Sequence, residues 1–213
     1  MMVKSLSNKE TQFVTKRYNR FAPLYNIMES PLEYFLYRRW RNQLWDVIEG
    51  EEILEMGVGT GKNISFYPDE GHITAIDISG NMLKRARIKA MEHEGNRVEL
   101  LEMDIQKMSF PDQSFDAVVA TFVFCSVPDP VRGLKEAFRV TKPSGKLYLL
   151  EHMLATANIL QPVMRFLDKP IYNISGVHIA RKTVSNIKKA GWQIENVTKY
   201  GISGIFRMIV AKK

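Results

Sequence analysis

Cysteine is almost absent from this sequence, since Cys125 is the single one among 213 residues. A single thiol excludes an internal disulfide and a metal site built from several cysteines. No apolar run approaches the roughly 20 residues that span a bilayer, and the opening stretch MMVKSLSNKETQFVTKRYNR lacks the apolar core of a secretory signal. With 45% hydrophobic and 25% charged residues, we expect a soluble, globular, cytoplasmic protein.

Acidic residues are scarce at both ends of the chain. Residues 1–48 hold eight Lys and Arg against four acids, and residues 152–213 hold ten against two. The middle, residues 49–151, has the opposite balance, with twelve against seventeen. Basic flanks favour an anionic partner such as phospholipid, nucleic acid or an acidic substrate, but scattered solvated lysines explain the same counts equally well.

From residue 50 onward, short strand-like runs alternate with helix-like segments. The strand-like runs are 51–57, 72–79, 97–104, 114–124 and 145–152, and the helix-like segments begin at Gly61, Gly80 and Asp129. This alternation predicts an α/β fold with a mostly parallel sheet. Two last runs, 192–201 and 204–213, are joined by a Gly/Ser turn, which predicts an antiparallel hairpin at the sheet edge.

The stretch ILEMGVGTGKN, residues 53–63, carries the first sign of a ligand. Gly57, Gly59 and Gly61 follow the first strand-like run, at the end where parallel sheets bind ligands, and glycine lets the backbone approach a ligand closely. The spacing G-x-G-x-G differs from the dinucleotide fingerprint and from a Walker A loop. Glu55 in front of it would repel phosphate and favour a cation.

Two further acids stand at the ends of the next strand-like runs. Asp77 follows Glu55 at about the interval where an acid commonly accepts hydrogen bonds from a ribose. Asp104 lies between Met103 and Ile105, so it could bind an adenine amino group while apolar neighbours flank the ring. Together these residues indicate a nucleoside with a positive, phosphate-free tail, and S-adenosylmethionine has that chemistry.

These motifs, with EMDIQKMSFPDQSFDAVVATFVFCSV and AFRVTKPSGKLYLLEH, resemble in order and spacing those of class I S-adenosylmethionine-dependent methyltransferases. The resemblance covers about residues 50–152 and implies a Rossmann-like, seven-stranded, mostly parallel sheet with an antiparallel last strand and helices on both faces. It implies that the glycine loop and Glu55 surround the methionine moiety. The remaining expected cofactor contacts are Asp77 at the ribose, Asp104 and Ile105 at the adenine, and Ile78, Met82 and Thr121 around them.

The segment RYNRFAPLYN, residues 17–26, resembles the cap of the branch that contains ubiquinone/menaquinone-type and phosphatidylethanolamine N-methyltransferases. This resemblance implies an N-terminal helical cap over residues 1–48, part of the same domain as residues 49–213. Tyr18 and Tyr25 are then candidates to face the sulfonium, because an aromatic face favours a cation. The other interpretation is that both rings pack inside the cap.

Two stretches mix apolar and basic residues, which favours a lipid-like acceptor. They are LEYFLYRRWRNQLW, residues 32–45, and ILQPVMRFLDKPIYN, residues 159–173, within an expected substrate-side insertion at about 153–180. Such a helix can lie in a membrane interface, with Arg38, Arg39, Arg41 and Trp40 as its contacts, or pack its apolar side on the domain and expose its arginines. We therefore expect a lipid-like or small-molecule substrate, peripheral contact with anionic membrane and no nucleic acid.

The acceptor itself is left open between several chemistries. The segment FVFCSVPDP lacks the Arg-Asn pair usual in quinone-methylating enzymes. It resembles the corresponding segments of phosphatidylethanolamine and thiol methyltransferases more closely. This resemblance favours an amine or a thiol over a quinol as the methyl acceptor. Candidate catalytic groups are Tyr18, Tyr25 and His152, with Tyr172 and His178 as further possible helpers. A module that binds the cofactor without transferring a methyl group is the non-enzymatic alternative.

Overall fold

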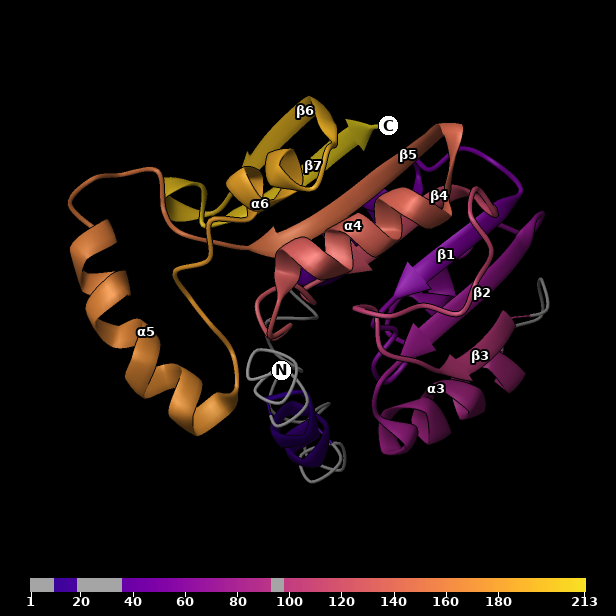
Figure 1. Ribbon diagram of the computed structural model, residues 1–213, viewed down its shortest axis with the longest axis horizontal. Coiled ribbons are helices and arrows are strands. Elements are labelled where there is room, and N and C mark those ends of the chain that lie inside the picture. The colour runs from indigo at the N-terminus through magenta and orange to yellow at the C-terminus, as the bar shows by residue number, and fades with distance from the viewer. Residues whose placement is uncertain (1–9, 19–35, 93–97) are drawn as a thin grey trace, which may run out of the picture.

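The computed structural model describes residues 10–18, 36–92 and 98–213. Tyr25 and most of the segment RYNRFAPLYN lie outside these residues. Within the described part, one seven-stranded sheet runs through the molecule in the order β3-β2-β1-β4-β5-β7-β6 (Figure 1). The strands are β1 (Glu52–Met56), β2 (His72–Asp77), β3 (Val98–Glu102), β4 (Phe115–Thr121), β5 (Thr141–His152), β6 (Gln193–Tyr200) and β7 (Phe206–Lys212).

The strand directions confirm the predicted fold class. Strands β1 to β5 are parallel to one another, whereas β7 is antiparallel to both β5 and β6. The two last strands form the predicted hairpin at one edge of the sheet. Because β1 to β4 are parallel, their C-terminal ends meet at one edge, where the glycine loop also lies.

Within the described residues, five helices that have both ends defined surround the sheet. They are α2 (Arg38–Trp45), α3 (Gly80–Glu92), α4 (Pro130–Val140), α5 (Gln161–Ser175) and α6 (Thr183–Lys189). Residues 10–18 are also helical. None of the helices in these ranges combines the length and the apolar content needed to cross a membrane.

The segment after Gly61 forms only a short 3-10 turn, η2 (Ile64–Phe66), so the prediction of a full helix there is wrong. Gly57, Gly59 and Gly61 all have positive φ angles, which an α-helix does not permit. Pro68 follows the turn and lacks the amide hydrogen that a continuing helix would need. The glycine loop therefore leads into a tight turn.

Both faces of the central strands are apolar because both are covered by helices. Side chains at Leu54, Val118 and Leu147 enter the core cluster that includes α4 and α6. Their chain neighbours Ile53 and Val119 point to the other face and join the cluster that includes α2 and α3. This alternation is the period of two that a strand imposes, and covered faces explain the continuous apolar runs in the sequence.

Helix α2 packs its aromatic side on the domain, so the expectation that Trp40 enters a membrane interface is wrong. Trp40 is buried and stacks on Tyr200 at 5.0 Å between ring centroids. Leu44 and Trp45 are buried as well, while Arg38 and Arg39 remain exposed. Of the two interpretations of this stretch, the structure supports packing on the domain.

Helix α5 lies in the expected insertion and stands away from the sheet (Figure 1). Met164 is its one buried residue among those described. Arg17, on the helical segment 10–18, donates a hydrogen bond from Nη1 to the backbone oxygen of Tyr172 at 3.2 Å. The N-terminal helical segment therefore joins α5 to the rest of the molecule.

Candidate functional site

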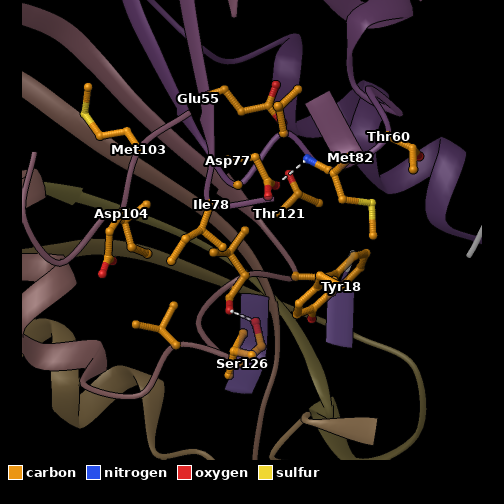
Figure 2. Close-up of a pocket in the computed structure, with 18 of the residues that line it drawn as sticks. Tyr18, Glu55, Thr60, Asp77, Ile78, Met82, Met103, Asp104, Thr121 and Ser126 are labelled. Atoms are coloured by element: carbon orange, nitrogen blue, oxygen red, sulfur yellow. Dashed lines mark hydrogen bonds between the residues drawn. The ribbon is translucent and has the colours of Figure 1, made fainter. Parts of the chain in front are cut away.

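A cavity opens at the C-terminal ends of β1, β2 and β4 and contains most of the residues that the sequence predicts for a ligand site (Figure 2). Its wall comes from the glycine loop, the ends of three strands, the start of α3 and one face of residues 10–18. The predicted residues in this wall are Tyr18, Glu55, Gly57, Gly59, Asp77, Ile78, Met82, Asp104, Ile105 and Thr121.

The three loop glycines have different surroundings. A Cβ atom added to Gly59 would meet nothing within 4 Å, so this position faces the open space of the cavity. A Cβ on Gly57 would lie 2.5 Å from the Val123 side chain. Gly61 is not part of the cavity wall, and its Cβ would lie 2.6 Å from Ile64 and 3.1 Å from the backbone of Ala86. The structure therefore places Gly61 at a packing contact with α3.

Asp77 is held at the end of β2 by two backbone donors. The N–H groups of Gly59 and Ser79 donate to its two carboxylate oxygens, each at 2.8 Å. Burial raises the pKa of Asp77 to about 6, although these hydrogen bonds act in the opposite direction. Each oxygen keeps a lone pair, so the carboxylate can accept further hydrogen bonds from hydroxyl groups of a ligand.

Glu55 lies at the centre of a buried hydrogen-bond network. Its Oε1 accepts from Asn63 Nδ2 at 2.6 Å, and its Oε2 accepts from the hydroxyl of Tyr67. Burial raises the pKa of Glu55, while the donors Tyr67 and Asn63 and the nearby charge of Arg41 lower it. The network fixes the position of the carboxyl group beside the glycine loop.

Asn63 connects Glu55 to two other residues of the cavity wall. Its Nδ2 also donates to Thr121 Oγ1 at 3.0 Å, and its Oδ1 accepts from Arg41 Nη1 at 2.8 Å. Arg41 is 5% exposed and lines the cavity, so the expectation that Arg41 contacts a membrane is wrong. This guanidinium instead brings a positive charge to the end of the cavity where Glu55 lies.

Asp104 is oriented by Gln106, a residue that sequence reasoning does not select. Gln106 Nε2 donates to Asp104 Oδ1 at 3.1 Å, and its Oε1 accepts from the Asp129 N–H at 3.0 Å. The same Nε2 donates to Thr11 Oγ1 at 3.3 Å. Gln106 is 3% exposed and therefore joins the third strand end to α4 and to the N-terminal helical segment.

One face of the N-terminal helical segment closes the cavity. Thr11, Val14 and Tyr18 line it, and their spacing of three and four residues places them on the same side of a helix. In Figure 2, Asp104 and Met103 lie on one side of the view and Tyr18 and Met82 on the other. Val14 is 5% exposed, so this face excludes water from the part of the cavity that it covers.

The other catalytic candidates that the structure describes lie outside the cavity wall. His152 ends β5 with its ring against Phe206, and burial lowers its pKa. His178 pairs with Asp168 at 2.7 Å and stacks on Tyr172. Neither histidine contributes to the wall, whereas Tyr18 does, so Tyr18 is the one described catalytic candidate in contact with the cavity.

Asn63, Phe122 and Gln106 are wall residues that the sequence motifs do not identify. Asn63 and Gln106 each stand two positions beyond a predicted site residue, Gly61 and Asp104, which is the one local signal for them. Phe122 follows β4 directly and has a φ of +57°, an uncommon conformation for a large side chain. Such backbone strain is concentrated at functional sites, but it is not visible in a sequence.

The comparison with known proteins agrees with this geometry. Residues 54–149 match the family model described as a methyltransferase domain. A phosphatidylethanolamine N-methyltransferase from Cereibacter sphaeroides is 35% identical over 166 residues, which cover 75% of this chain and 78% of that relative. The chain belongs to the class I S-adenosylmethionine-dependent methyltransferases.

Two other comparisons describe this methyltransferase chain further. A demethylmenaquinone methyltransferase from Listeria welshimeri is 33% identical over 153 residues, and the match covers 68% of this chain but only 65% of that relative. A solved structure from Thermotoga maritima, titled a possible histamine N-methyltransferase, has a TM-score of 0.69 at 21% identity. It covers 93% of this chain and 99% of that one, and at this identity it shows the shared fold alone.

The cavity of this methyltransferase domain fits S-adenosylmethionine by the chemistry of its donors and acceptors. Asp77 can accept from ribose hydroxyls, and Asp104 from an adenine amino group, with Ile78, Met82 and Ile105 as apolar neighbours. Arg41 and Glu55 lie at the same end of the cavity and match the carboxylate and the ammonium of a methionine tail. The open space over Gly59 leaves room for a ligand between these groups.

Proposed function

We propose that this protein transfers a methyl group from S-adenosylmethionine to the amine of phosphatidylethanolamine or a related lipid. The cofactor part rests on the cavity and on family membership. The acceptor part rests chiefly on the surface of α5, which exposes an apolar stripe beside the domain, and on the similarity to a phosphatidylethanolamine N-methyltransferase.

S-adenosylmethionine supplies an activated methyl group on a sulfonium when it is bound. The protein's own contribution is to hold and orient the two reactants, which can account for up to about 7–11 kcal/mol of a reaction barrier. Asp77 and Asp104 fix the nucleoside end, and the network of Glu55, Asn63 and Arg41 fixes the opposite end. Val14 and Tyr18 cover the cavity and keep water out.

The catalytic roles of Tyr18 and Tyr25 stay predictions. A lipid ammonium is mostly protonated at neutral pH, so an amine acceptor must lose a proton before it can act as a nucleophile. Tyr18 presents an aromatic ring and a hydroxyl group to the cavity. Its aromatic face would favour the cationic sulfonium of the cofactor.

Helix α5 presents apolar side chains to solvent along one line. The exposed residues of this line are Val163, the adjacent pair Phe166 and Leu167, Pro170 and Ile174, with successive positions three or four residues apart. Phe166 is 81% exposed and Ile174 is 76% exposed. Ile159 continues the line before the helix and is 83% exposed. An apolar stripe of this kind normally faces a protein core, so here it fits a hydrocarbon partner.

Basic residues of the same helix favour a membrane as that partner. Arg165 and Lys169 are exposed beside the apolar stripe, and Asp168 is already paired with His178. A helix with an apolar stripe and flanking cations can lie in the interface of a bilayer that contains anionic lipid. The lipid acceptor could then be reached without a membrane-spanning helix.

A quinol C-methyltransferase is the second candidate, because demethylmenaquinone methyltransferases are among the similar proteins. A quinol is also a membrane lipid, so α5 suits both acceptors. The Arg-Asn pair usual in the quinone enzymes is absent from FVFCSVPDP, which favours the amine. Small thiols are a third class of acceptor and would need no exposed apolar stripe.

An assay with labelled S-adenosylmethionine tests the acceptor directly. We would offer phosphatidylethanolamine, demethylmenaquinol, small thiols and RNA separately and identify the labelled product. The proposal expects label in monomethylated phosphatidylethanolamine. Label in the quinol or in a thiol, with none in phosphatidylethanolamine, would transfer the assignment to that acceptor.

Membrane contact through α5 has a matched control on α3. We expect Val163→Ser with Phe166→Ser to abolish flotation with vesicles that contain anionic lipid, because the apolar stripe is interrupted. The pair Ile88→Ser and Met91→Ser removes two exposed apolar side chains with the same spacing and should leave flotation unchanged. Equal losses in both variants, or flotation unaffected in both, would argue against α5 as the membrane contact.

A further inference from the structure

A second hollow in the surface carries an unusual concentration of positive charge. It lies between residues 153–156 after β5, the first part of α5, helix α6 and β7. No Asp or Glu is among the described residues that line it. Its cations, which we call the basic hollow, are Arg165, Arg181, Lys182, Lys188, Lys189 and Arg207.

Acidic side chains near the basic hollow act on Arg181, whose pKa is lowered by burial and raised, to a smaller extent, by Asp168 and Asp129. Among the described residues, none of the six cations forms an ion pair. Arg207 donates to the backbone oxygens of Gly204 and Leu154, and Arg181 donates from Nη2 to the backbone oxygen of Val127 at 2.6 Å. Like charges gathered in a concave surface focus the electrostatic potential and raise the local concentration of anions.

Two polar atoms of the hollow's lining also lack a partner. Arg181 Nε and Thr183 Oγ1 are buried and make no hydrogen bond. Thr183 is 1% exposed, and it lies next in the chain to Lys182. Buried donors without acceptors are costly, so a bound acceptor that reaches them would stabilise this part of the structure. An oxyanion has several acceptor oxygens and would satisfy both charge and hydrogen bonding.

We propose that the basic hollow binds a phosphate group, and specifically the phosphodiester of a glycerophospholipid. The lipid source follows from α5, which supplies Gln161 and Arg165 to the hollow from one side and carries the exposed apolar stripe on its other side. A phosphate with attached acyl chains matches that pair of surfaces. This assignment rests on the proposed lipid acceptor, since it gives that lipid's headgroup a binding site.

The hollow is linked to the cofactor cavity through Arg181. This side chain lines the hollow, and the backbone oxygen that it binds belongs to Val127, a residue of the cavity wall. The N–H of His178 donates to the backbone oxygen of Cys125 at 2.9 Å, so a second contact joins the same two segments. A headgroup held in the hollow would lie beside the wall behind which the methyl donor binds.

The first arm of the test uses inorganic phosphate and needs no activity. We would titrate phosphate against chloride at constant ionic strength and follow amide shifts by NMR. The wild-type protein should show saturable shifts at residues of the hollow. The variant Lys182→Gln/Lys188→Gln should bind phosphate at least about tenfold more weakly, the loss expected when charged hydrogen-bond partners are removed.

A matched control separates this effect from the change in net charge. Lys84 and Lys135 are exposed on α3 and α4, outside both the hollow and the cavity. The variant Lys84→Gln/Lys135→Gln loses the same charge and should bind phosphate as the wild type does. Absence of saturable binding in the wild type, or equal weakening in both variants, would overturn the phosphate site.

The second arm distinguishes a lipid from free phosphate. Short-chain phosphatidylethanolamine, used below the concentration at which it forms micelles, should displace phosphate and bind more tightly, with the same loss in Lys182→Gln/Lys188→Gln. Failure to displace phosphate would overturn the lipid assignment. If both binding arms succeed while no phosphatidylethanolamine is methylated, the proposed function fails and the lipid phosphate site stands.

Discussion

Asp77 shows how one carboxylate can serve the local fold and a ligand together. Its oxygens accept the N–H groups of Gly59 and Ser79, so the same side chain shapes the glycine loop and the entry to α3. Burial raises its pKa to about 6, which places its titration near physiological pH. The protonation state of Asp77 should therefore control cofactor affinity.

We expect the affinity for S-adenosylhomocysteine to fall as the pH is lowered through about 6. The ionised carboxylate accepts hydrogen bonds from ribose hydroxyls, and protonation removes an acceptor, so binding is stronger above that pKa. Asp77→Asn should bind more weakly at pH 7.5, by roughly 1–3 kcal/mol. Calorimetry at several pH values compares the two proteins, and an identical pH dependence in both would remove Asp77 from this role.

The glycine loop allows two similar substitutions to be compared. Gly59 and Gly61 both have positive φ angles, so an alanine at either position carries a similar backbone strain. The Gly59 hydrogen faces the cavity, whereas the Gly61 hydrogen faces Ile64 and Ala86. A side chain added at Gly59 should therefore affect cofactor binding, whereas one added at Gly61 should affect the stability of the fold.

Gly61→Ala should lower thermal stability more than Gly59→Ala, because its methyl group would lie 2.6 Å from the Ile64 side chain and 3.1 Å from the Ala86 backbone. Gly59→Val should weaken cofactor binding more than it lowers stability, since its side chain occupies cavity space. Thermal unfolding and calorimetry on all three variants measure both effects. The idea fails if Gly59→Val binds S-adenosylhomocysteine as tightly as the wild type does.

At the scale of elements, strand β5 positions the loop that follows β4. Glu151 Oε1 accepts the N–H groups of Val123 and Phe124 at 2.9 and 3.0 Å, and its Oε2 is buried without a partner. Burial raises the pKa of Glu151 to about 8, against 4.5 for an unperturbed glutamate. Phe122 and Val123 line the cavity, so Glu151 supports the site from behind.

This buried carboxyl group should make stability depend on pH. Between about 4.5 and 8 the unfolded chain releases the proton that the folded protein retains, and stability falls as the pH rises. Glutamine can accept the same two backbone hydrogen bonds without titrating. Glu151→Gln should therefore be more stable at pH 7 by on the order of 2 kcal/mol. Denaturant unfolding at pH 7 and pH 4 tests this, with the difference expected to vanish at pH 4.

At the scale of the whole molecule, the acidic middle of the chain supplies most of the cofactor cavity and the basic C-terminal part supplies the basic hollow. The two sites are joined by the segments 123–128 and 178–181. The phosphate of the acceptor and the cofactor would then be held on opposite sides of one wall.

Ligand binding should stabilise the entire domain, because the cavity wall draws on β1, β2, β4, α3 and residues 10–18. Saturating S-adenosylhomocysteine, at about 100 times its Kd, should add about 2.7 kcal/mol to the free energy of unfolding. NAD and ATP should add little at equal concentration, since the pattern G-x-G-x-G and Glu55 do not favour phosphate. A larger thermal shift with NAD would contradict this selectivity.

Local features of the sequence determined the sheet and much of the cavity. Alternating apolar runs predicted the parallel strands, and two late runs predicted the hairpin of β6 and β7. Glu55, Asp77 and Asp104 stand at successive strand ends, and parallel strands bring such ends to one edge whatever the details of packing. These predictions succeeded because they depend on period and order along the chain.

Only the tertiary structure decided whether the apolar face of an amphipathic helix contacts the domain or the solvent. Periodicity shows which residues share a face of α2 or α5, but not what that face meets. Packing on Tyr200 buries Trp40 and turns Arg41 into the cavity, whereas α5 stands apart and leaves Phe166 in solvent. The cations of the basic hollow are spread along the chain from residue 165 to residue 207. Local sequence patterns do not show which residues come into contact over such long separations.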